Sequence, residues 1–309
     1  MTHELRLDPL TREWVAIVAD RQARPNLAPD PTGREGCPFC VGGLEAPEPY
    51  TVRAFENRWP PFAPGAPIDA DGALAGATGF VSLPARGASE VVLYSPDHAG
   101  SLATLGVAGA RAVVDLWAER TAALLARPEV EHVLVFENRG ALVGATIPHP
   151  HGQIYGFPFV PPVPRREAEV AAAHGCPVCA AIAREVADGA RVVRDADGWA
   201  TVVPFASAYP YGALLAPHAH DDGLPALAAK SRDGLAAALV DLVSRYDRLF
   251  DGELPYLMWV HQGVHVHVHF APPLRAPGTP RFVASGEVGS GTFGNPVAPE
   301  AAAAALRAV

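Results

Sequence analysis

The sequence has few cysteines and lacks any long apolar run. Its 309 residues include four cysteines, all of them in two Cys-x-x-Cys pairs, Cys37/Cys40 and Cys176/Cys179. No run approaches the ~18 consecutive apolar residues of a membrane-spanning helix. The stretch from Met1 to Trp14 is charged and lacks the apolar region of a signal peptide. We therefore expect a cytoplasmic protein that does not act in a membrane.

Positive charge is in deficit. The formal net charge is -9, which disfavours general binding to nucleic acids or to anionic membrane surfaces. An anionic substrate would have to be bound by a local group of arginines. Nearly half of the residues are apolar, so the chain is expected to be globular, with one large domain or two of medium size.

The cysteine spacing favours metal binding. In a reducing compartment two Cys-x-x-Cys pairs indicate metal ligands rather than disulfides. A thioredoxin-type redox pair is the alternative, but neither pair opens a helix after a clear strand. A proline follows the first cysteine of each pair, Pro38 and Pro177, which suits the tight turn of a zinc knuckle.

The segment His149-Pro-His-Gly-Gln153 is the strongest candidate for chemistry. Pro150 fixes its own φ and favours an extended conformation at His149. Side chains two residues apart in an extended segment share a face, so both imidazoles are expected to point the same way. Neutral imidazole is a good nucleophile toward phosphorus. This predicts that His151 carries the chemistry while His149 is held in place, for instance by a metal.

The chain contains a hidden repeat. Each half has the order Cys-x-x-Cys, strand, a proline closely followed by a histidine (Pro96/His98 and Pro217/His220), long helix, strand, His-x-His, with long helices expected at about 102–126 and 224–250. Residues 63–78, rich in proline, glycine and aspartate, are expected to form a mobile loop. We predict an α+β fold made of two similar units, residues 1–165 and 166–309. Each unit is an antiparallel sheet crossed by a helix, and the sheets join edge to edge.

The His149-Pro-His-Gly-Gln153 motif resembles the signature of the galactose-1-phosphate uridylyltransferase family, a branch of the histidine-triad superfamily. The resemblance extends over nearly the whole chain and implies the duplicated histidine-triad fold. It also implies ping-pong transfer of UMP from UDP-glucose to galactose 1-phosphate, in the Leloir pathway of galactose metabolism. The implied intermediate is a uridylyl group on His151, and the implied assembly is a homodimer.

Gln153 stands where histidine-triad hydrolases carry a third histidine. An amide can donate to a phosphoryl oxygen but cannot readily protonate a leaving group or act as a base. Transfer between phosphates needs no such proton, so Gln153 favours transfer over hydrolysis.

The resemblance also implies substrate contacts. Arg21 and Arg24 match phosphate-contacting arginines, and Asn57 lies in a segment similar to the one that contacts uracil and ribose. Asn138 matches a nucleotide-contacting asparagine, and Thr146 replaces a serine near the phosphate. Arg281, Phe282 and Glu287 lie in a tail segment that reaches across the dimer to the hexose in the family.

Metal sites are expected in both halves. Two thiolates and two imidazoles suit a tetrahedral structural zinc, and the family's zinc ligands match Cys37, Cys40, His98 and His149. The repeat predicts a second set in Cys176, Cys179, His220 and His265. Some relatives instead hold a second metal, zinc or iron, through residues that match Glu167, His261, His267 and His269. If His265, His267 and His269 lie in one strand, they share a face, so the two second-half sets are treated as rivals. Thiolates bind zinc tightly, which favours the set that contains Cys176 and Cys179.

Three functions are compatible with these residues. The first is a UDP-glucose–hexose-1-phosphate uridylyltransferase. The second, in the same fold, is an adenylyl-transferring phosphorylase that acts on ADP-glucose. The third is a non-catalytic, zinc-stabilised nucleotide-binding protein, which the intact His151 and Gln153 disfavour.

Overall fold

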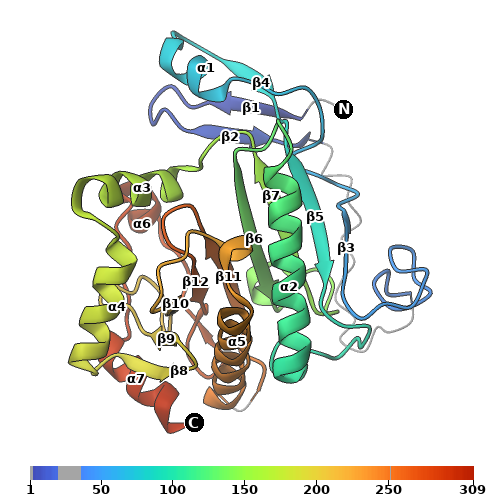
Figure 1. The fold of residues 1–309 in the computed structure, drawn as a ribbon. Helices are drawn as coiled ribbons and strands as arrows, with labels where there is room; N and C mark the ends of the chain where they lie inside the picture. Colours follow the sequence, from blue (N-terminus) through green and yellow to red (C-terminus); the bar gives the residue numbers. More distant parts are fainter. Residues whose placement is uncertain (1–2, 20–35, 251) are drawn as a thin grey trace.

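The computed structural model describes residues 3–19, 36–250 and 252–309 (Figure 1). Its centre is a nine-stranded sheet in which every neighbouring pair is antiparallel. The strand order is β3 (Arg53–Glu56), β5 (Ala88–Leu93), β7 (His151–Phe157), β6 (His132–Arg139), β11 (Tyr256–His261), β12 (His267–Ala271), β10 (Ala213–Pro217), β9 (Trp199–Val202) and β8 (Val192–Ala196). The predicted extended antiparallel sheet is thereby confirmed.

The two halves of the sheet mirror one another about the seam between β6 and β11. Strands β5, β6 and β7 of the first repeat correspond to β10, β11 and β12 of the second, and the sheet order runs outward from the seam in the same way on both sides. Residues 256–260 of β11 pair with 139–135 of β6. The sheet is thus continuous across the repeat.

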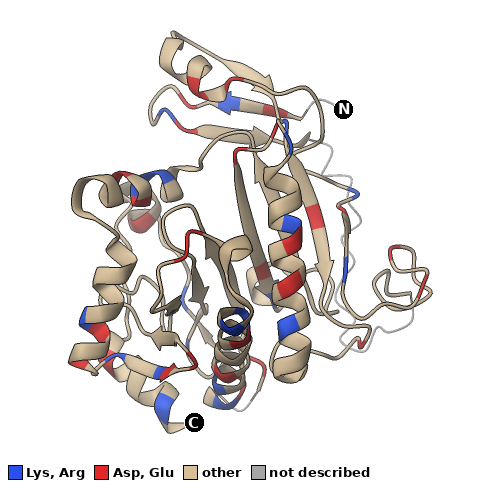
Figure 2. Cartoon of the chain, viewed as in Figure 1, with Lys and Arg blue, Asp and Glu red and all other residues tan. Residues whose placement is uncertain are grey.

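Two long helices cover one face of the sheet. These are α2 (Gly106–Leu125) and α5 (Ala229–Leu249), which pack against each other (Figure 1). Trp117 and Leu124 of α2 and Leu239 of α5 are fully buried in one common core, as helical spacing of apolar residues predicts. Acidic and basic residues are mixed on the outer surfaces of these helices (Figure 2).

The opposite face differs between the halves. In the second half it is covered by α4 (Pro177–Asp188), whose Val178 and Ile182 pack on Ala200 and Val202 of β9. The helix α3 (Pro162–His174) precedes it and packs against it. In the first half the same face is covered by the loop that contains Cys37 and Phe39. This loop leaves part of β7 uncovered.

Smaller elements surround the sheet. A three-stranded sheet contains β2 (Trp14–Ile17), β1 (Glu4–Leu7) and β4 (Ser82–Pro84), and a short hairpin contains β13 (Leu274–Ala276) and β14 (Thr279–Pro280). The chain ends with α6 (Ser285–Ser290) and α7 (Pro299–Ala308). Among the described residues, no helix combines the length and the apolar character needed to cross a bilayer.

One expectation for the fold is wrong. Residues 63–78 are not entirely loop, because α1 spans Ala70–Gly76. Asp69 caps this helix by accepting a hydrogen bond from the backbone N–H of Gly72 at 2.7 Å, and Ala70 is buried in a small core beside Phe62. Capping and packing together outweigh the loop-like composition of the segment.

Candidate active site

His151 begins β7 and has a defined tautomer. Its Nδ1 lies 2.8 Å from the backbone carbonyl oxygen of His149. Because a carbonyl can only accept, Nδ1 must carry the proton, and Nε2 then carries the lone pair. The ring lies against Phe39, with ring centroids 5.1 Å apart. This is the protonation state that a nucleophilic histidine requires.

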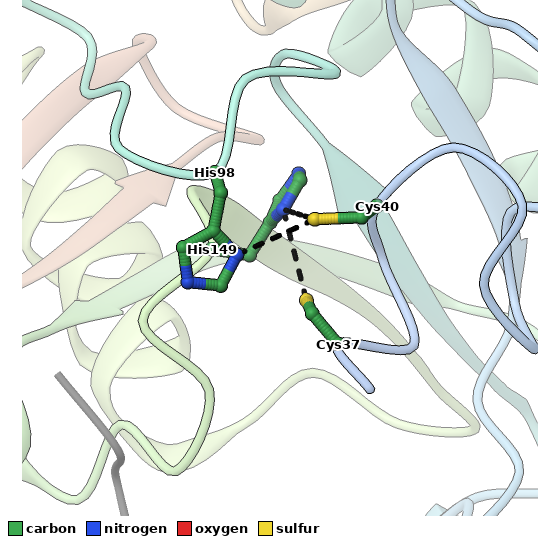
Figure 3. A group of neighbouring side chains, drawn as sticks. All are labelled: Cys37, Cys40, His98 and His149. Atoms are coloured by element: carbon green, nitrogen blue, oxygen red, sulfur yellow. Dashed lines mark hydrogen bonds between the residues drawn. The ribbon is translucent and has the colours of Figure 1, made fainter. Parts of the chain in front are cut away.

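His149 has the opposite tautomer and is buried. Its Nε2 lies 2.7 Å from the carbonyl oxygen of Ser95, so this nitrogen carries the proton. Its Nδ1 therefore faces Cys37 and Cys40, with N–S distances of 3.9 and 3.7 Å (Figure 3). Burial lowers the pKa of His149 to about 4, so the ring is neutral, as a metal ligand must be.

The group Cys37, Cys40, His98 and His149 fits a tetrahedral metal. Its four ligand atoms lie within 4.8 Å of one another, and His98 Nδ1 is 3.4 Å from Cys40 Sγ. Zinc–ligand bonds of about 2.0–2.3 Å would place sulfur and nitrogen ligands roughly 3.5 Å apart. The donor set and the spacing both suit zinc.

Two cavities meet at His151. A cavity of about 360 Å³ lies over β3, β5 and β7 and has apolar walls that include Phe55 and Trp59. A second cavity, of about 240 Å³, lies at the strand ends beyond His151. The residues singled out in the sequence divide between them: Asn57, Thr146 and Gln153 line the first, and Asn138 lines the second.

The second half contains two further ligand groups. Cys176, Cys179, His220 and His265 form one, with N–S distances of 3.2 to 3.4 Å. Glu167, His261, His267 and His269 form the other, in which the Glu167 carboxylate lies 2.8 Å from His261 Nδ1. In each group the ligand atoms lie within 4.8 Å of one another.

The expectation that these two sets compete is wrong. It assumed that His265, His267 and His269 lie in one strand and share a face. The strand β12 begins only at His267, so His265 precedes it and its ring reaches Cys176 and Cys179. His267 and His269 remain on the strand and point with His261 toward Glu167. Both ligand groups can therefore form at the same time in one chain.

In the second half, His267 has the same local geometry as His151, but other side chains block access to it. His267 Nδ1 lies 2.7 Å from the carbonyl of His265, as His151 Nδ1 does from that of His149. However, Glu167 of α3 lies over the rings of His261 and His267, and His267 is only 4% exposed. A substrate can therefore reach His151 but not His267.

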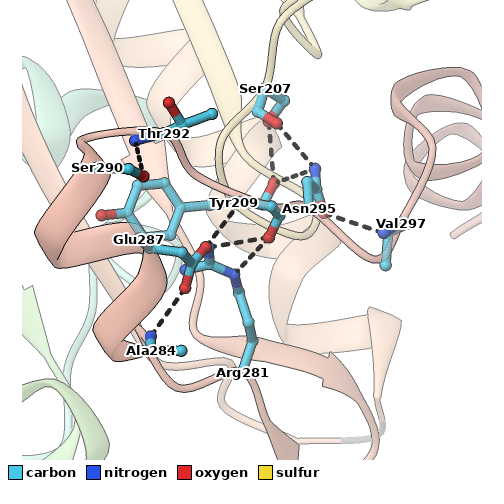
Figure 4. A network of polar contacts seen from close by, with 10 residues as sticks. Ser207, Tyr209, Arg281, Ala284, Glu287, Ser290, Thr292, Asn295 and Val297 are labelled. Atoms are coloured by element: carbon cyan, nitrogen blue, oxygen red, sulfur yellow. Dashed lines mark hydrogen bonds and ion pairs between the residues drawn. The ribbon is translucent and has the colours of Figure 1, made fainter.

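The tail residues do not line either cavity at His151. The buried guanidinium of Arg281 pairs with Glu287, donates to the carbonyl of Gly294 at 2.9 Å and lies over the ring of Tyr209 (Figure 4). Phe282 is 79% exposed. The network holds α6 in place within this chain. Arg21 and Arg24 lie outside the described residues.

Two residues at the site were not found from the sequence. The Tyr50 hydroxyl lies 3.0 Å from His149 Nε2 and 2.8 Å from the carbonyl of Ser95. Glu137 is buried and lines the 240 Å³ cavity. Burial raises its pKa to about 7. Neither lies in a motif of its own, and only the Phe-Glu-Asn-Arg-Gly run before the histidines draws attention to Glu137.

Comparisons with known proteins cover nearly the whole chain. Residues 1–161 match the family model for the galactose-1-phosphate uridyl transferase N-terminal domain, and residues 169–309 match the model for the C-terminal domain. A galactose-1-phosphate uridylyltransferase of Thermotoga maritima is 37% identical over 98% of both chains. One of Streptomyces lividans is 34% identical over 87% of this chain and 72% of its own length.

Solved structures agree in fold. A uridylyltransferase structure superposes with a TM-score of 0.83 at 27% identity, covering 99% of this chain and 97% of the other. An ADP-glucose phosphorylase of Arabidopsis thaliana with bound ADP-glucose superposes with a TM-score of 0.72 at 23% identity, over 99% and 98% of the two chains. At that identity the second likeness concerns the fold alone.

Proposed function

The chain belongs to the galactose-1-phosphate uridylyltransferase family, and we propose that it transfers UMP from UDP-glucose to a hexose 1-phosphate through a covalent intermediate on His151. The observation that carries this proposal is the tautomer of His151. Its Nδ1–H donates to the His149 carbonyl, so Nε2 carries the lone pair at the junction of the two cavities.

In the first half-reaction, His151 Nε2 attacks the α-phosphorus of UDP-glucose. A nitrogen–phosphorus bond forms, the bond from the α-phosphorus to the bridging oxygen breaks, and glucose 1-phosphate leaves with that electron pair. The carbonyl of His149 stabilises the positive charge that develops on the ring, because it accepts from the Nδ1–H. No proton needs to move to the leaving phosphate.

In the second half-reaction, a phosphate oxygen of the hexose 1-phosphate attacks the same phosphorus. The nitrogen–phosphorus bond breaks, and its electron pair returns to His151. Gln153 lies on the same face of β7 as His151, two residues along, and its amide can donate to a phosphoryl oxygen in both steps. The amide cannot act as a base to activate a water molecule, which favours transfer over hydrolysis.

The 360 Å³ cavity is proposed as the nucleoside site. Apolar and aromatic walls suit a flat base, and Thr146 and Gln153 lie at its end beside His151. Asn138, in the adjoining cavity, is proposed to contact the phosphate groups of the nucleotide sugar. Contacts to the phosphates are still proposed for Arg21 and Arg24. Contacts to the hexose are still proposed for Arg281, Phe282 and Glu287 of a second copy of the chain. The homodimer and a cytoplasmic location remain proposals as well.

Zinc is proposed for the group Cys37, Cys40, His98 and His149. Four protein ligands make a structural site, and bound zinc would supply no reactive water there. Its proposed contribution is to fix His149, whose carbonyl sets the tautomer of His151. Metals are also proposed for both ligand groups of the second half, with zinc for the cysteine-containing group and zinc or iron for the group around Glu167.

We also propose the division into two histidine-triad-like units, 1–165 and 166–309. The mirrored strand order about the seam supports it.

The intact mass of the protein tests the proposed function. After brief mixing with UDP-glucose without an acceptor, the wild-type protein should gain the mass of one uridylyl group, and added galactose 1-phosphate should remove it. A gain of an adenylyl group from ADP-glucose, with none from UDP-glucose, would replace the proposal by the phosphorylase reaction. No adduct from either reagent would leave only nucleotide binding.

A further inference from the structure

The orientation of the Gln153 amide decides whether it helps or hinders the reaction. The two ends of a side-chain amide are opposite in character, since the NH₂ group donates and the oxygen accepts. A phosphoryl oxygen needs a donor. If the Gln153 oxygen faced it instead, two partially negative atoms would meet at the reacting centre. Some other group must therefore fix which end of Gln153 faces the substrate.

Asn57 contacts one end of that amide. It follows β3, and its backbone N–H donates to the carbonyl of Ser89 at 2.8 Å, which anchors it beside the sheet. Its side-chain Nδ2 lies 3.3 Å from Gln153 Oε1. This contact alone does not set a direction, because either side-chain amide can donate its NH₂ group to the oxygen of the other. A third group is needed to decide the direction.

The backbone of Trp59 is that third group. Its N–H lies 2.9 Å from Asn57 Oδ1. A backbone N–H can only donate, so the atom it meets must be the oxygen of the Asn57 side chain. The NH₂ of Asn57 then faces Gln153 and requires an acceptor there, which is Oε1. The Nε2 end of Gln153 is consequently the end turned away from Asn57.

We propose that Asn57 is a positioning residue that fixes the amide of Gln153 so that its NH₂ group donates to the phosphoryl group on His151. The relay runs from the Trp59 N–H through Asn57 to Gln153, and each hydrogen bond sets the direction of the next. The proposal rests on the function proposed above, because it needs a phosphoryl group at His151. It gives Asn57 a role beyond the contact with the nucleoside that its place in the cavity suggests.

The variant Asn57→Asp tests the direction of the relay. The introduced carboxylate still accepts from the Trp59 N–H, but it presents a second acceptor to Gln153. The Gln153 amide must then turn its NH₂ toward this carboxylate and its oxygen toward the phosphate. Asn57→Asp should slow single-turnover nucleotidylation of His151 by about 10²-fold, the usual cost of losing one donor to a transition-state oxyanion. Asn57→Ala leaves the amide free to adopt either orientation and should cost less, about two- to tenfold.

The negative charge of the introduced carboxylate could repel the phosphates by itself, and a double-mutant cycle separates this effect. In a Gln153→Ala background there is no amide to turn, so Asn57→Asp and Asn57→Ala should react at rates within about threefold of each other. Nucleotidylation is followed by intact mass at saturating UDP-glucose. The concentration for half saturation is measured separately, because a lost nucleoside contact would change it, and melting temperature reports on folding.

The outcomes distinguish this inference from the proposed function. A wild-type protein that forms no adduct overturns both. If the wild type reacts, the inference alone is overturned by either of two results. One is an Asn57→Asp variant as fast as the Asn57→Ala variant. The other is a penalty of Asn57→Asp that persists in full without Gln153. The expected result is a large penalty that disappears in the Gln153→Ala background.

Discussion

The two histidines of the motif are separated by one residue and have opposite tautomers. His149 donates from Nε2 to Ser95 and presents Nδ1 to the cysteines. His151 donates from Nδ1 to the His149 carbonyl and keeps its lone pair on Nε2. In both cases a backbone carbonyl determines the tautomer, because it cannot donate. Ligation and nucleophilic attack are thereby assigned to different residues.

This division of roles predicts different behaviour of two variants. His151→Gly should lose UDP-glucose turnover, yet it leaves a space of imidazole size beside intact nucleotide contacts. A uridine 5′-phosphorimidazolide carries the missing ring, so the variant should still pass UMP from this reagent to galactose 1-phosphate. His149→Gly should not be rescued, since its ring is proposed to bind metal, and it should also lower the melting temperature.

Parallel assays of both variants with the phosphorimidazolide check this prediction. Circular dichroism and metal content serve as controls for folding. Equal rescue of the two variants, or full UDP-glucose turnover by His151→Gly, would contradict the assignment of His151 as the nucleophile.

At the scale of elements, the sequence predicted those features that depend on repeated or local patterns. The order of cysteines, strands, helices and histidines is the same in both halves, and this predicted the duplicated sheet and the helices α2 and α5. The helix boundaries differed by a few residues. A turn in which Ser101 and Thr104 each accept a side-chain hydrogen bond from the other's backbone N–H precedes α2, and a short 3-10 helix, Leu224–Ala226, precedes α5. The orientation of His151 was predictable because the hydrogen bond that sets it joins residues only two apart in the chain.

Other features depend on contacts between distant segments. The alternation of histidines from His265 to His269 predicts one strand, but it cannot show that pairing begins only at His267 with β11 and at Val268 with β10. The helix α1 is stabilised by its Asp69 cap and by packing in a small core, and neither can be predicted from the composition of the segment. Tyr50 reaches His149 across 99 residues, and no sequence pattern marks such a contact.

The start of β12 leads to a prediction about metal content. Because His265 and His267 face different ligand groups, the wild-type protein should bind three metal ions per chain, one for each ligand group. Cys179→Ser should lose one ion, and His269→Ala should lose another, while each variant keeps the remaining ions. Metal analysis of freshly purified protein by inductively coupled plasma mass spectrometry measures the stoichiometry.

Cys37→Ser is the matched comparison, since it removes a ligand of the group at the active site and should lower both stability and activity. A wild-type protein that lacks the third metal, and in which Cys179→Ser or His269→Ala causes no loss, would show that one of the second-half groups is not a metal site.

At the scale of the whole molecule, the two halves meet along the strands β6 and β11 and along the helices α2 and α5. The seam between β6 and β11 contains a buried acid, Glu137, whose carboxylate accepts from the Tyr256 hydroxyl of the other half at 3.1 Å. Its second oxygen, Oε2, has no hydrogen-bond partner among the residues that the structure describes. Arg139, two residues along, pairs with Asp247 of α5. The joint between the halves therefore includes a titratable group that is incompletely satisfied.

The stability of the molecule should depend on the protonation of this group. Burial raises the pKa of Glu137 from its ordinary value of 4.5 to about 7, although Arg139 and the hydroxyls of Tyr256 and Tyr94 act in the opposite direction. Between these two pH values the folded chain binds one more proton than the unfolded chain. The contribution of Glu137 to stability is therefore complete below about pH 4.5 and is lost as the pH rises through 7.

Glu137→Gln should remove this dependence, because an amide stays neutral at every pH. The difference in unfolding free energy between variant and wild type should grow in favour of the variant from about pH 5 to pH 8, by on the order of 3 kcal/mol. Denaturant unfolding at a series of pH values measures it, and metal-ligand titrations largely cancel in the difference. Glu253→Gln is the control, because it removes a second carboxylate that approaches the same Arg139 from a position that is 75% exposed. A Glu137→Gln difference that stayed flat with pH would show that Glu137 is ionised in the folded protein throughout this range.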